Sequence, residues 1–397
     1  MNICIVGGGC SSFVCAIIAS RRGYKVTILE KNNNVMKKLL LTGNGKCNYF
    51  NEDMTPSHYR SSNDELIKTI INDSNTKNVL SFFSDLGVVP RIKNGYYYPY
   101  SNTSTSIKNL LLIEAKRLNI NIKTNTKVLD IIKNKKFIIK TNNEDVICDK
   151  VVIASGSNAS IKNDEYNIYD ILKRLGHKII KPLPALVMLE GKEKYYNDWA
   201  GIRSDAVVSL YENNKLVCSY EGEVQLTNYG ISGICVMNLS GRVARGLLNN
   251  KKEVLRINFM PLVPYVFEYL IDRSNQHKNL TVIELLESII NYKLLYVILK
   301  KNNIDINKKW DELSYEEKHI LSKDLSSFEL NITSTKGIEN AQVVSGGVDL
   351  TEVKENFESK IINGLYLIGE VLDVDGDCGG YNLGFAWLSG LIVGEEI

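Results

Sequence analysis

The residues best placed to do chemistry lie in the first thirty positions of the chain. An apolar run, Met1 to Val6, leads directly into Gly7-Gly8-Gly9-Cys10-Ser11-Ser12, and a helix-forming stretch and a second apolar run then end at Glu30. In a dinucleotide-binding unit, one glycine makes a tight turn and another lets the backbone approach a pyrophosphate, which the N–H groups of the following helix attract. Gly7 and Gly9 hold these two positions.

An acid and a small residue complete the pattern. Glu30 follows the loop by about 20 residues at a strand end, where a carboxylate accepts hydrogen bonds from the ribose hydroxyls of adenosine and disfavours a ribose phosphate. Ser12 stands where Gly or Ala usually sets how closely helix and strand pack, and serine is small enough for that place. The alternative is a plain strand-to-helix turn with a solvated acid. The intact order of strand, loop, helix, strand and acid favours an adenine dinucleotide.

A second glycine-rich stretch lies near the C-terminus. Residues 364–370 indicate a buried strand that ends at Gly369 and Glu370, and Asp373 to Leu383 then lead into an expected helix over 382–395. Glycines before a helix let its N–H groups approach a ligand, and the positive end of the helix dipole would stabilise negative charge on a reduced flavin. We therefore expect FAD. No second G-x-G-x-x-G follows downstream, so NADH or NADPH would be a transient electron donor, or oxygen would close the cycle.

Bulk composition narrows the functional class. The 397 residues suffice for two or three domains, with 44% hydrophobic and 23% charged residues and a net charge of +3, which shows no strong bias towards nucleic acid or membrane. The eight cysteines include no C-x-x-C pair, so we expect neither a zinc site nor dithiol chemistry. The three aspartates of 373–377 lack the sixth-position glycine and twelfth-position glutamate of a calcium loop, so no metal is expected.

The location of the protein is a further expectation. Met1 to Val6 is itself the first strand rather than a cleavable signal, and the apolar stretch Leu383 to Val393 is too short to span a bilayer. We expect a cytoplasmic protein that acts on a small molecule without contact to a membrane or to nucleic acid. The oligomeric state stays open.

The elements that position these residues follow from hydrophobic periodicity and turn signals. We expect helices over Asp64 to Leu86 and Ser104 to Leu118. A strand over Asp149 to Ala154 should end at a small-residue turn, Ser155-Gly156, which resembles the first loop in its setting. The N-terminal portion and the C-terminal tail should then form one dinucleotide-binding core.

The middle of the chain should form an insertion into that core. Short strands with Gly and Asn turns over Leu186 to Ile257 indicate a β-rich segment. Residues 251–324 favour helices instead, among them one over Thr281 to Lys301.

Several motifs are specific enough to indicate a family. They are the glycine loop with Glu30-Lys31, the run Lys37 to Asn48 (KKLLLTGNGKCN) with Asn51, Gly230-Ile231-Ser232-Gly233, Gly346-Gly347-Val348, and Gly369 to Asp377 through Asn382-Leu383. On these residues the chain resembles the BaiN-like flavoproteins, also labelled aminoacetone-oxidase-family FAD-binding enzymes, over nearly its whole length.

The resemblance implies an α/β fold in three parts. A Rossmann-like FAD-binding domain would cover residues 1–185 and 344–397, an inserted β-barrel-like domain 186–257 and 325–343, and a small helical insertion 258–324. It also implies that Thr42 to Asn48 and Asp377 to Leu383 surround the flavin. Together with the glycine loop, the predicted cofactor site comprises Gly7, Gly8, Gly9, Ser11, Ser12, Glu30, Lys31, Lys38, Thr42, Gly43, Asn44, Gly45, Asn48, Val128, Ala154, Gly156, Gly369, Glu370, Asp377, Gly380, Tyr381, Asn382 and Leu383.

The activities that the resemblance implies are NAD(P)H-dependent reduction of conjugated carbon–carbon double bonds in steroid-like substrates, and amine oxidation. For an enone, hydride passes from flavin N5 to the β-carbon and a positioned acid supplies a proton to the α-carbon. Tyr381 is one candidate acid, and the cluster of Tyr96, Tyr97, Tyr98 and Tyr100 offers another, although aromatic residues in strands usually fill cores.

Other residues and other functions remain open on the sequence. Cys47 lies beside Lys46, which could lower the pKa of its thiol, but a small buried side chain is the alternative. The four histidines fall in no recognisable constellation. Rival functions are an FAD protein that serves RNA modification, with the lysine-bearing helical insertion as its docking surface, and a non-catalytic flavin sensor.

Overall fold

The computed structural model describes residues 1–161 and 168–397. The chain forms two compact units, which are taken one at a time below. The first unit contains Met1–Pro182 and Val343–Ile397, and the second contains Leu183–Gln342. The chain thus leaves the first unit once and returns to it. The predicted division into three parts, with 258–324 as a part of its own, stays a prediction.

A five-stranded parallel sheet forms the centre of the first unit. Its order is β21 (Leu365–Leu367), β11 (Lys150–Ile153), β1 (Asn2–Val6), β2 (Lys25–Leu29) and β7 (Asn121–Lys123). β1 lies in the middle, and its residues 3–6 are buried, as expected for a strand covered on both faces. The predicted α/β fold with a Rossmann-like sheet is confirmed.

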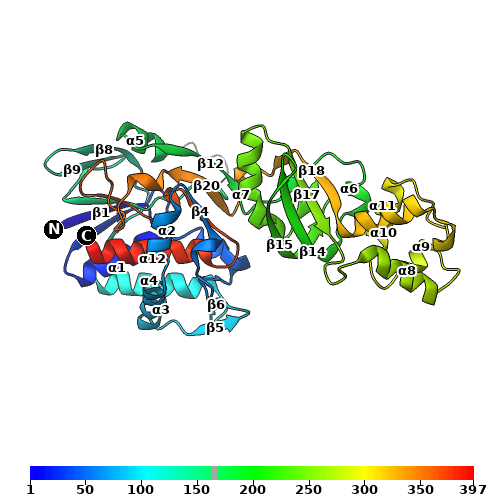
Figure 1. The fold of residues 1–397 in the computed structure, drawn as a ribbon. Helices are drawn as coiled ribbons and strands as arrows, with labels where there is room; N and C mark the ends of the chain where they lie inside the picture. The colour runs from blue at the N-terminus through cyan, green and yellow to red at the C-terminus, as the bar shows by residue number, and fades with distance from the viewer. Residues whose placement is uncertain (162–167) are drawn as a thin grey trace. The chain divides into compact units, whose positions relative to one another are not determined.

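Two helices from opposite ends of the chain pack together in this unit. α1 (Cys10–Arg21) and α12 (Tyr381–Glu396) lie side by side (Figure 1). Their close approach depends on glycine, because a Cβ at Gly390 would lie 2.6 Å from the Ser11 carbonyl oxygen and a Cβ at Gly394 would lie 2.7 Å from Ile18 Cβ. The structure confirms that the C-terminal tail returns to the N-terminal core.

Smaller elements complete the first unit. They are β3 (Phe50–Asn51), β4 (Tyr59–Ser61), α2 (Asp64–Ile70), α3 (Asp73–Asp85), β5 (Pro90–Lys93), β6 (Tyr96–Pro99), α4 (Ser104–Arg117), β8 (Val128–Lys133), β9 (Phe137–Thr141), β10 (Val146–Cys148), α5 (Ile168–Arg174), β12 (Ile179–Ala185, which runs into the second unit), β20 (Val343–Val348) and β22 (Val374–Gly376). The single helix predicted over Asp64 to Leu86 is wrong: Ile71 is extended, and the Asn72 side chain accepts the Asn75 N–H to start a new helix.

The second unit is built on a seven-stranded antiparallel sheet. Its order is β18 (Phe328–Ile332), β17 (Glu253–Asn258), β14 (Arg203–Glu212), β15 (Lys215–Leu226), β16 (Gly230–Ser232), β13 (Leu189–Glu190) and β19 (Ser334–Thr335). Its helices are α6 (Tyr196–Trp199), α7 (Ile234–Leu248), α8 (Val266–Gln276), α9 (Val282–Leu286), α10 (Tyr292–Lys301) and α11 (Tyr315–Ser326).

Three sequence predictions in this unit need correction. The stretch Leu186 to Ile257 contains the 15-residue helix α7 as well as strands. Residues 253–258 form β17 rather than the start of the helical segment. The helix predicted over Thr281 to Lys301 is two helices, because the Asn291 side chain caps a new start by accepting the Lys293 N–H. In the described part of the chain, no helix is long and apolar enough to cross a membrane.

Candidate cofactor site

The first glycine of the N-terminal loop is required by the packing of β1 against β11. Gly7 has a φ of 102°, and a Cβ there would lie 2.6 Å from both the Ala154 carbonyl oxygen and Ser155 Cα. Gly9, in contrast, has only the Ala154 oxygen within 4 Å of its missing Cβ, at 3.7 Å. Gly7 therefore makes the turn, and Gly9 leaves open space at the start of α1.

The predicted acid lies against the same loop. Glu30 is 8% exposed, and its Oε2 accepts the Gly8 N–H at 2.7 Å while its Oε1 accepts the backbone and side-chain N–H groups of Asn32 at 2.8 and 2.6 Å. These three bonds leave about one acceptor site, on Oε2, since an ionised carboxylate accepts about four hydrogen bonds. Glu30 can thus hold the loop and still accept a ribose hydroxyl.

Ser12 does more than fit into a small space. It is fully buried, and its hydroxyl donates to the Gly7 carbonyl oxygen at 2.5 Å. This bond ties the glycine turn to the first turn of α1, which glycine at this position could not do. Gly9, the N-cap of α1, contributes no side-chain cap, so the first N–H groups of the helix are available to an anion.

The C-terminal strand end meets the N-terminal loop. A Cβ at Gly369 would lie 2.8 Å from Ser11 Oγ, and the Lys38 ammonium forms an ion pair with Glu370 at 2.8 Å. Gly156, at the turn after β11, faces the same Glu370 carboxylate at 3.7 Å from its missing Cβ. Residues more than 300 positions apart therefore share one surface at the carboxyl ends of the parallel strands, where dinucleotides bind in this class of sheet.

The loop around residue 43 has a strained backbone. Gly43, Asn44, Gly45 and Cys47 all have positive φ values, between 53° and 83°, and Thr42 Oγ1 donates to the Leu39 carbonyl oxygen. Positive φ is uncommon outside glycine, and residues with such strained backbone cluster at sites that bind ligands. This loop is part of the predicted site.

The same loop meets the start of α12. A Cβ at Gly43 would lie 3.1 Å from the Asn48 nitrogen, and a Cβ at Gly380 would lie 3.1 Å from Asn48 Oδ1. Gly380 is the N-cap of α12, with a φ of 98° and no side-chain cap. Asn382 fixes the approach to the helix by bonding the N–H and the carbonyl oxygen of Gly376, both at 2.8 Å. Leu383 is half-buried in the following turn.

Two buried polar atoms without hydrogen-bond partners indicate that this region can hold a cofactor. Asn48 Oδ1 and Ser155 Oγ are buried and have no hydrogen-bond partner in the described protein. Leaving a buried polar group unpaired costs about 1–3 kcal/mol, so such groups usually have a ligand or water as partner. One atom lies at the glycine turn of β1 and the other at the start of α12. These are the two ends of a cradle suited to an elongated dinucleotide.

Three other predicted residues lie around this cradle. Thr126 donates its backbone N–H to the Glu30 carbonyl oxygen at 2.8 Å, which brings Val128, two residues further on and buried, to the acid end. Lys31 is half-buried next to Glu30. Ala154 is buried against Gly7.

An ion-pair network beside α12 was missed from the sequence. Arg60 donates its Nε to Asp375 at 2.8 Å and its Nη1 to Asp377, and all three side chains are no more than 16% exposed. Burial disfavours the charged guanidinium, but the two carboxylates outweigh this and raise the pKa of Arg60.

His58 joins the same network. Its Nδ1 lies 2.9 Å from Asp377 and its Nε2 lies 3.0 Å from Asp53, and its ring stacks on that of Tyr381 at 4.4 Å. Burial lowers the pKa of His58, but Asp377 and Asp53 outweigh it and the net pKa lies above its ordinary value. No sequence signal could have found this site, because His58 and Asp377 are 319 positions apart.

The neighbouring Lys46 does not lower the pKa of the candidate thiol, Cys47. Cys47 is fully buried, and burial raises its pKa to about 12. The thiol therefore stays protonated at neutral pH, and thiolate chemistry at Cys47 has no support. Among the described residues, no group of three or more His, Cys, Asp or Glu side chains is arranged to hold a metal ion.

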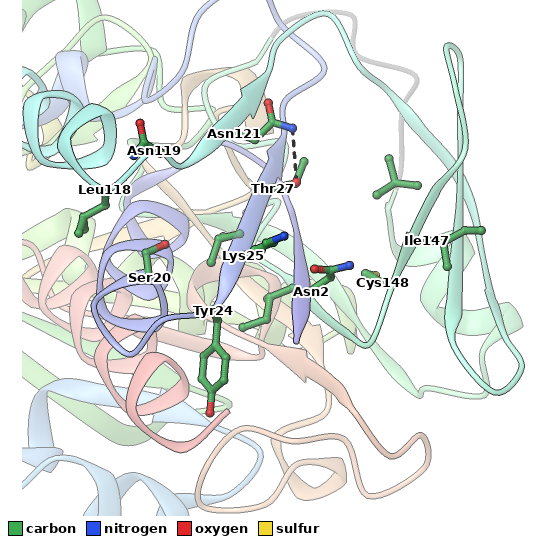
Figure 2. A pocket seen from close by; sticks show the side chains of 13 residues that line it. Asn2, Ser20, Tyr24, Lys25, Thr27, Leu118, Asn119, Asn121, Ile147 and Cys148 are labelled. Atoms are coloured by element: carbon green, nitrogen blue, oxygen red, sulfur yellow. Dashed lines mark hydrogen bonds between the residues drawn. The ribbon is translucent and has the colours of Figure 1, made fainter.

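A separate hollow lies at the opposite end of the parallel sheet. Figure 2 shows it at the amino ends of β1 and β2, with Asn2, Tyr24 and Lys25 around it, and its volume is about 510 Å³. Asn121 Nδ2 and Thr27 Oγ1 meet there at 3.5 Å. Ligands of open parallel sheets bind at the carboxyl ends, so this hollow is distinct from the cradle.

Comparison with known proteins gives matches over almost the whole chain. The chain matches the HI0933-like protein Rossmann domain family over residues 1–396. It is 35% identical to the 3-dehydro-bile acid delta(4,6)-reductase of Clostridium scindens, over 99% of this chain and 98% of that protein.

Relatives of lower sequence identity are named for a different activity. The chain is 25% identical to the ribosomal RNA dihydrouridine synthase of Escherichia coli, over 99% of this chain and 97% of that protein.

Among solved structures, it is similar in fold to the 3-ketosteroid delta1-dehydrogenase of Sterolibacterium denitrificans, with a TM-score of 0.52, 10% identity, and coverage of 99% of this chain and 98% of that one.

Proposed function

Because the chain belongs to the HI0933-like family of FAD-binding Rossmann proteins and is an FAD-dependent oxidoreductase, we propose that it reduces a carbon–carbon double bond conjugated to a carbonyl in a small hydrophobic molecule. NADH or NADPH is the proposed electron donor. The observation that carries the proposal is the 35% identity, over almost the full length of both chains, to a reductase of bile acid double bonds.

The residues of the cradle would divide the binding of FAD between them. Gly9 and the start of α1 would hold the pyrophosphate, and Glu30 the adenosine ribose. Asn48, Gly380 and the start of α12 would hold the flavin end, where N–H groups face developing negative charge. When bound, FAD supplies two-electron hydride chemistry.

The surrounding residues would keep this end rigid and partly shielded from water. Asp375 and Asp377 are held by Arg60, and Asn382 fixes the turn before the helix. A rigid scaffold keeps reacting atoms in position without reorganisation during the reaction. Besides the hydride that FAD supplies, the reaction needs one proton, which a side chain would deliver to the substrate carbon next to the carbonyl.

A second candidate function is reduction of uridine in RNA, which the 25% identity to ribosomal RNA dihydrouridine synthases favours. The chemistry is related, because the uracil C5–C6 double bond is also conjugated to a carbonyl. Charge argues for the small molecule: residues 258–324, the expected docking surface, contain nine Lys or Arg and ten Asp or Glu. RNA-binding surfaces are strongly basic.

The deciding experiment is anaerobic and spectroscopic. The FAD-loaded protein is mixed with NADH or NADPH, and bleaching of the flavin absorbance is followed. The reduced protein is then offered a planar enone, unmodified ribosomal RNA, an amine-derived imine, or oxygen. Rapid return of the yellow colour with the enone alone supports the proposal. Return with the RNA alone selects the second candidate, and return with oxygen or the imine alone selects an oxidase.

A further inference from the structure

The β5–β6 hairpin carries two tyrosines on one face. In its antiparallel register Lys93 pairs with Tyr96 and Arg91 pairs with Tyr98. Directly opposite residues point to the same face of such a pair, and successive residues alternate. Tyr96 and Tyr98 therefore share a face with the two cations, whereas Tyr97 points to the other face.

The face with Tyr96 and Tyr98 lies against both glycine loops of the cradle. A Cβ at Gly379 would lie 2.7 Å from Tyr96 Cε1, and a Cβ at Gly43 would lie 3.8 Å from Tyr98 Cε1. Gly379 immediately precedes the N-cap of α12, and Gly43 belongs to the strained loop. Both tyrosines are half-buried.

The other tyrosines of the region are engaged elsewhere. The Tyr97 ring packs edge-on against Tyr49 and Phe50, with centroids 6.1 and 5.6 Å apart. Tyr100 is 73% exposed. Tyr381 is 6% exposed and stacks on His58, so it is more deeply buried than Tyr96.

We propose that Tyr96 is the catalytic acid of the reduction and that Tyr98 forms the neighbouring wall of the substrate site. The inference rests on the proposed function. The Tyr96 O–H bond breaks and a C–H bond forms at the carbon next to the substrate carbonyl. FAD, when bound and reduced by a nicotinamide, would supply the two electrons as a hydride for the other alkene carbon. The substrate gains these electrons, and the Tyr96 phenolate then takes a proton from water.

The surroundings keep this phenol protonated before reaction. Burial and the neighbouring Cys378 raise the pKa of Tyr96, and burial, Tyr96 and Cys378 raise that of Tyr98. Lys93 and Arg91 share this face with the two tyrosines.

The test compares Tyr96→Phe with Tyr97→Phe, which removes the same hydroxyl from the opposite face of the strand. Reduction of the bound flavin by dithionite should be unchanged in both variants. Oxidation of the reduced protein by an enone should fall about 10²- to 10⁴-fold in Tyr96→Phe alone. Oxidation by a quinone, whose protons go to oxygen, should stay within about twofold of wild type.

A readout independent of turnover is the fluorescence of the bound oxidised flavin. A phenol in contact with a flavin quenches its emission by electron transfer, so emission should rise in Tyr96→Phe and not in Tyr97→Phe.

Three results would overturn the assignment. They are an enone rate of wild-type size in Tyr96→Phe, an equal loss with the quinone, or a loss confined to Tyr98→Phe. If no enone oxidises the reduced wild-type protein, the proposed function falls and the role as acid falls with it. The fluorescence comparison then still decides whether Tyr96 faces the flavin.

Discussion

Replacing Arg60 by methionine should destabilise the protein strongly. Methionine replaces the apolar stem of arginine but lacks the charge that holds Asp375 and Asp377, which are only 3% and 5% exposed. Removing one partner of a buried ion pair leaves an uncompensated charge and typically costs about 3–5 kcal/mol. Here one cation serves two carboxylates, so we expect Arg60→Met to lie at the upper end of that range, near 5 kcal/mol.

The matched control is Arg174→Met in the same unit. Arg174 pairs with Asp130 at 3.1 Å, but the two side chains are 56% and 44% exposed. An exposed pair contributes about 0–1 kcal/mol, so the control should lie within that range of wild type.

Urea-induced unfolding at pH 7.5 and at pH 5 measures both variants. A buried carboxylate without its cation is more easily neutralised by a proton, so the deficit of Arg60→Met should shrink as the pH falls. If Arg60→Met and Arg174→Met lose equal free energy, or if the deficit grows at pH 5, the role given to this network is wrong.

Three further predictions concern the cradle and the packing around it. Glu30→Gln should weaken FAD binding about tenfold or more, because charge-assisted hydrogen bonds contribute about 1.5–3 kcal/mol. A flavin fluorescence titration measures this, and an unchanged Kd would show that Glu30 does not bind FAD. Gly390→Val should lower the midpoint of thermal unfolding by separating α1 from α12, since even a Cβ would lie 2.6 Å from the Ser11 carbonyl oxygen. A midpoint equal to that of wild type would show that the two helices do not pack this closely. The pKa of His58 is raised in the folded state. Protonated His58 therefore stabilises the fold fully at pH values below its unfolded-state pKa, and this stabilisation is lost as the pH rises through its folded-state pKa. Thermal midpoints across pH 5.5–8.5 should show this loss in wild type and not in His58→Gln.

Local sequence signals predicted the parts of the fold that depend on near neighbours. The strand, Gly7 turn, helix and Glu30 follow one another within thirty residues, and each has its own signature. The C-terminal strand and helix were predicted for the same reason. Their meeting with the N-terminal loop was expected from the way the chain returns to its core, and the contact of Gly369 with Ser11 confirms it.

Long-range contacts explain what was missed. Helix α7 contains Gly241 and Gly246, which suggest turns, yet a Cβ at Gly246 would overlap the Glu253 carboxylate. Gly246 therefore serves packing rather than turning, and only the tertiary structure distinguishes the two. The network of His58 and Arg60 likewise carries no local signature, because Asp375 and Asp377, which join it, lie more than 300 positions away.

The central claim is that the start of α1 and the start of α12 hold the two ends of one FAD. Hydrogen exchange of the protein with and without bound FAD tests this directly, because a bound ligand protects the backbone N–H groups that it contacts. Bound FAD should slow exchange at residues 8–12 and at residues 379–383 together. Protection of only one stretch, or of the hollow lined by Asn2 and Lys25 instead, would contradict it.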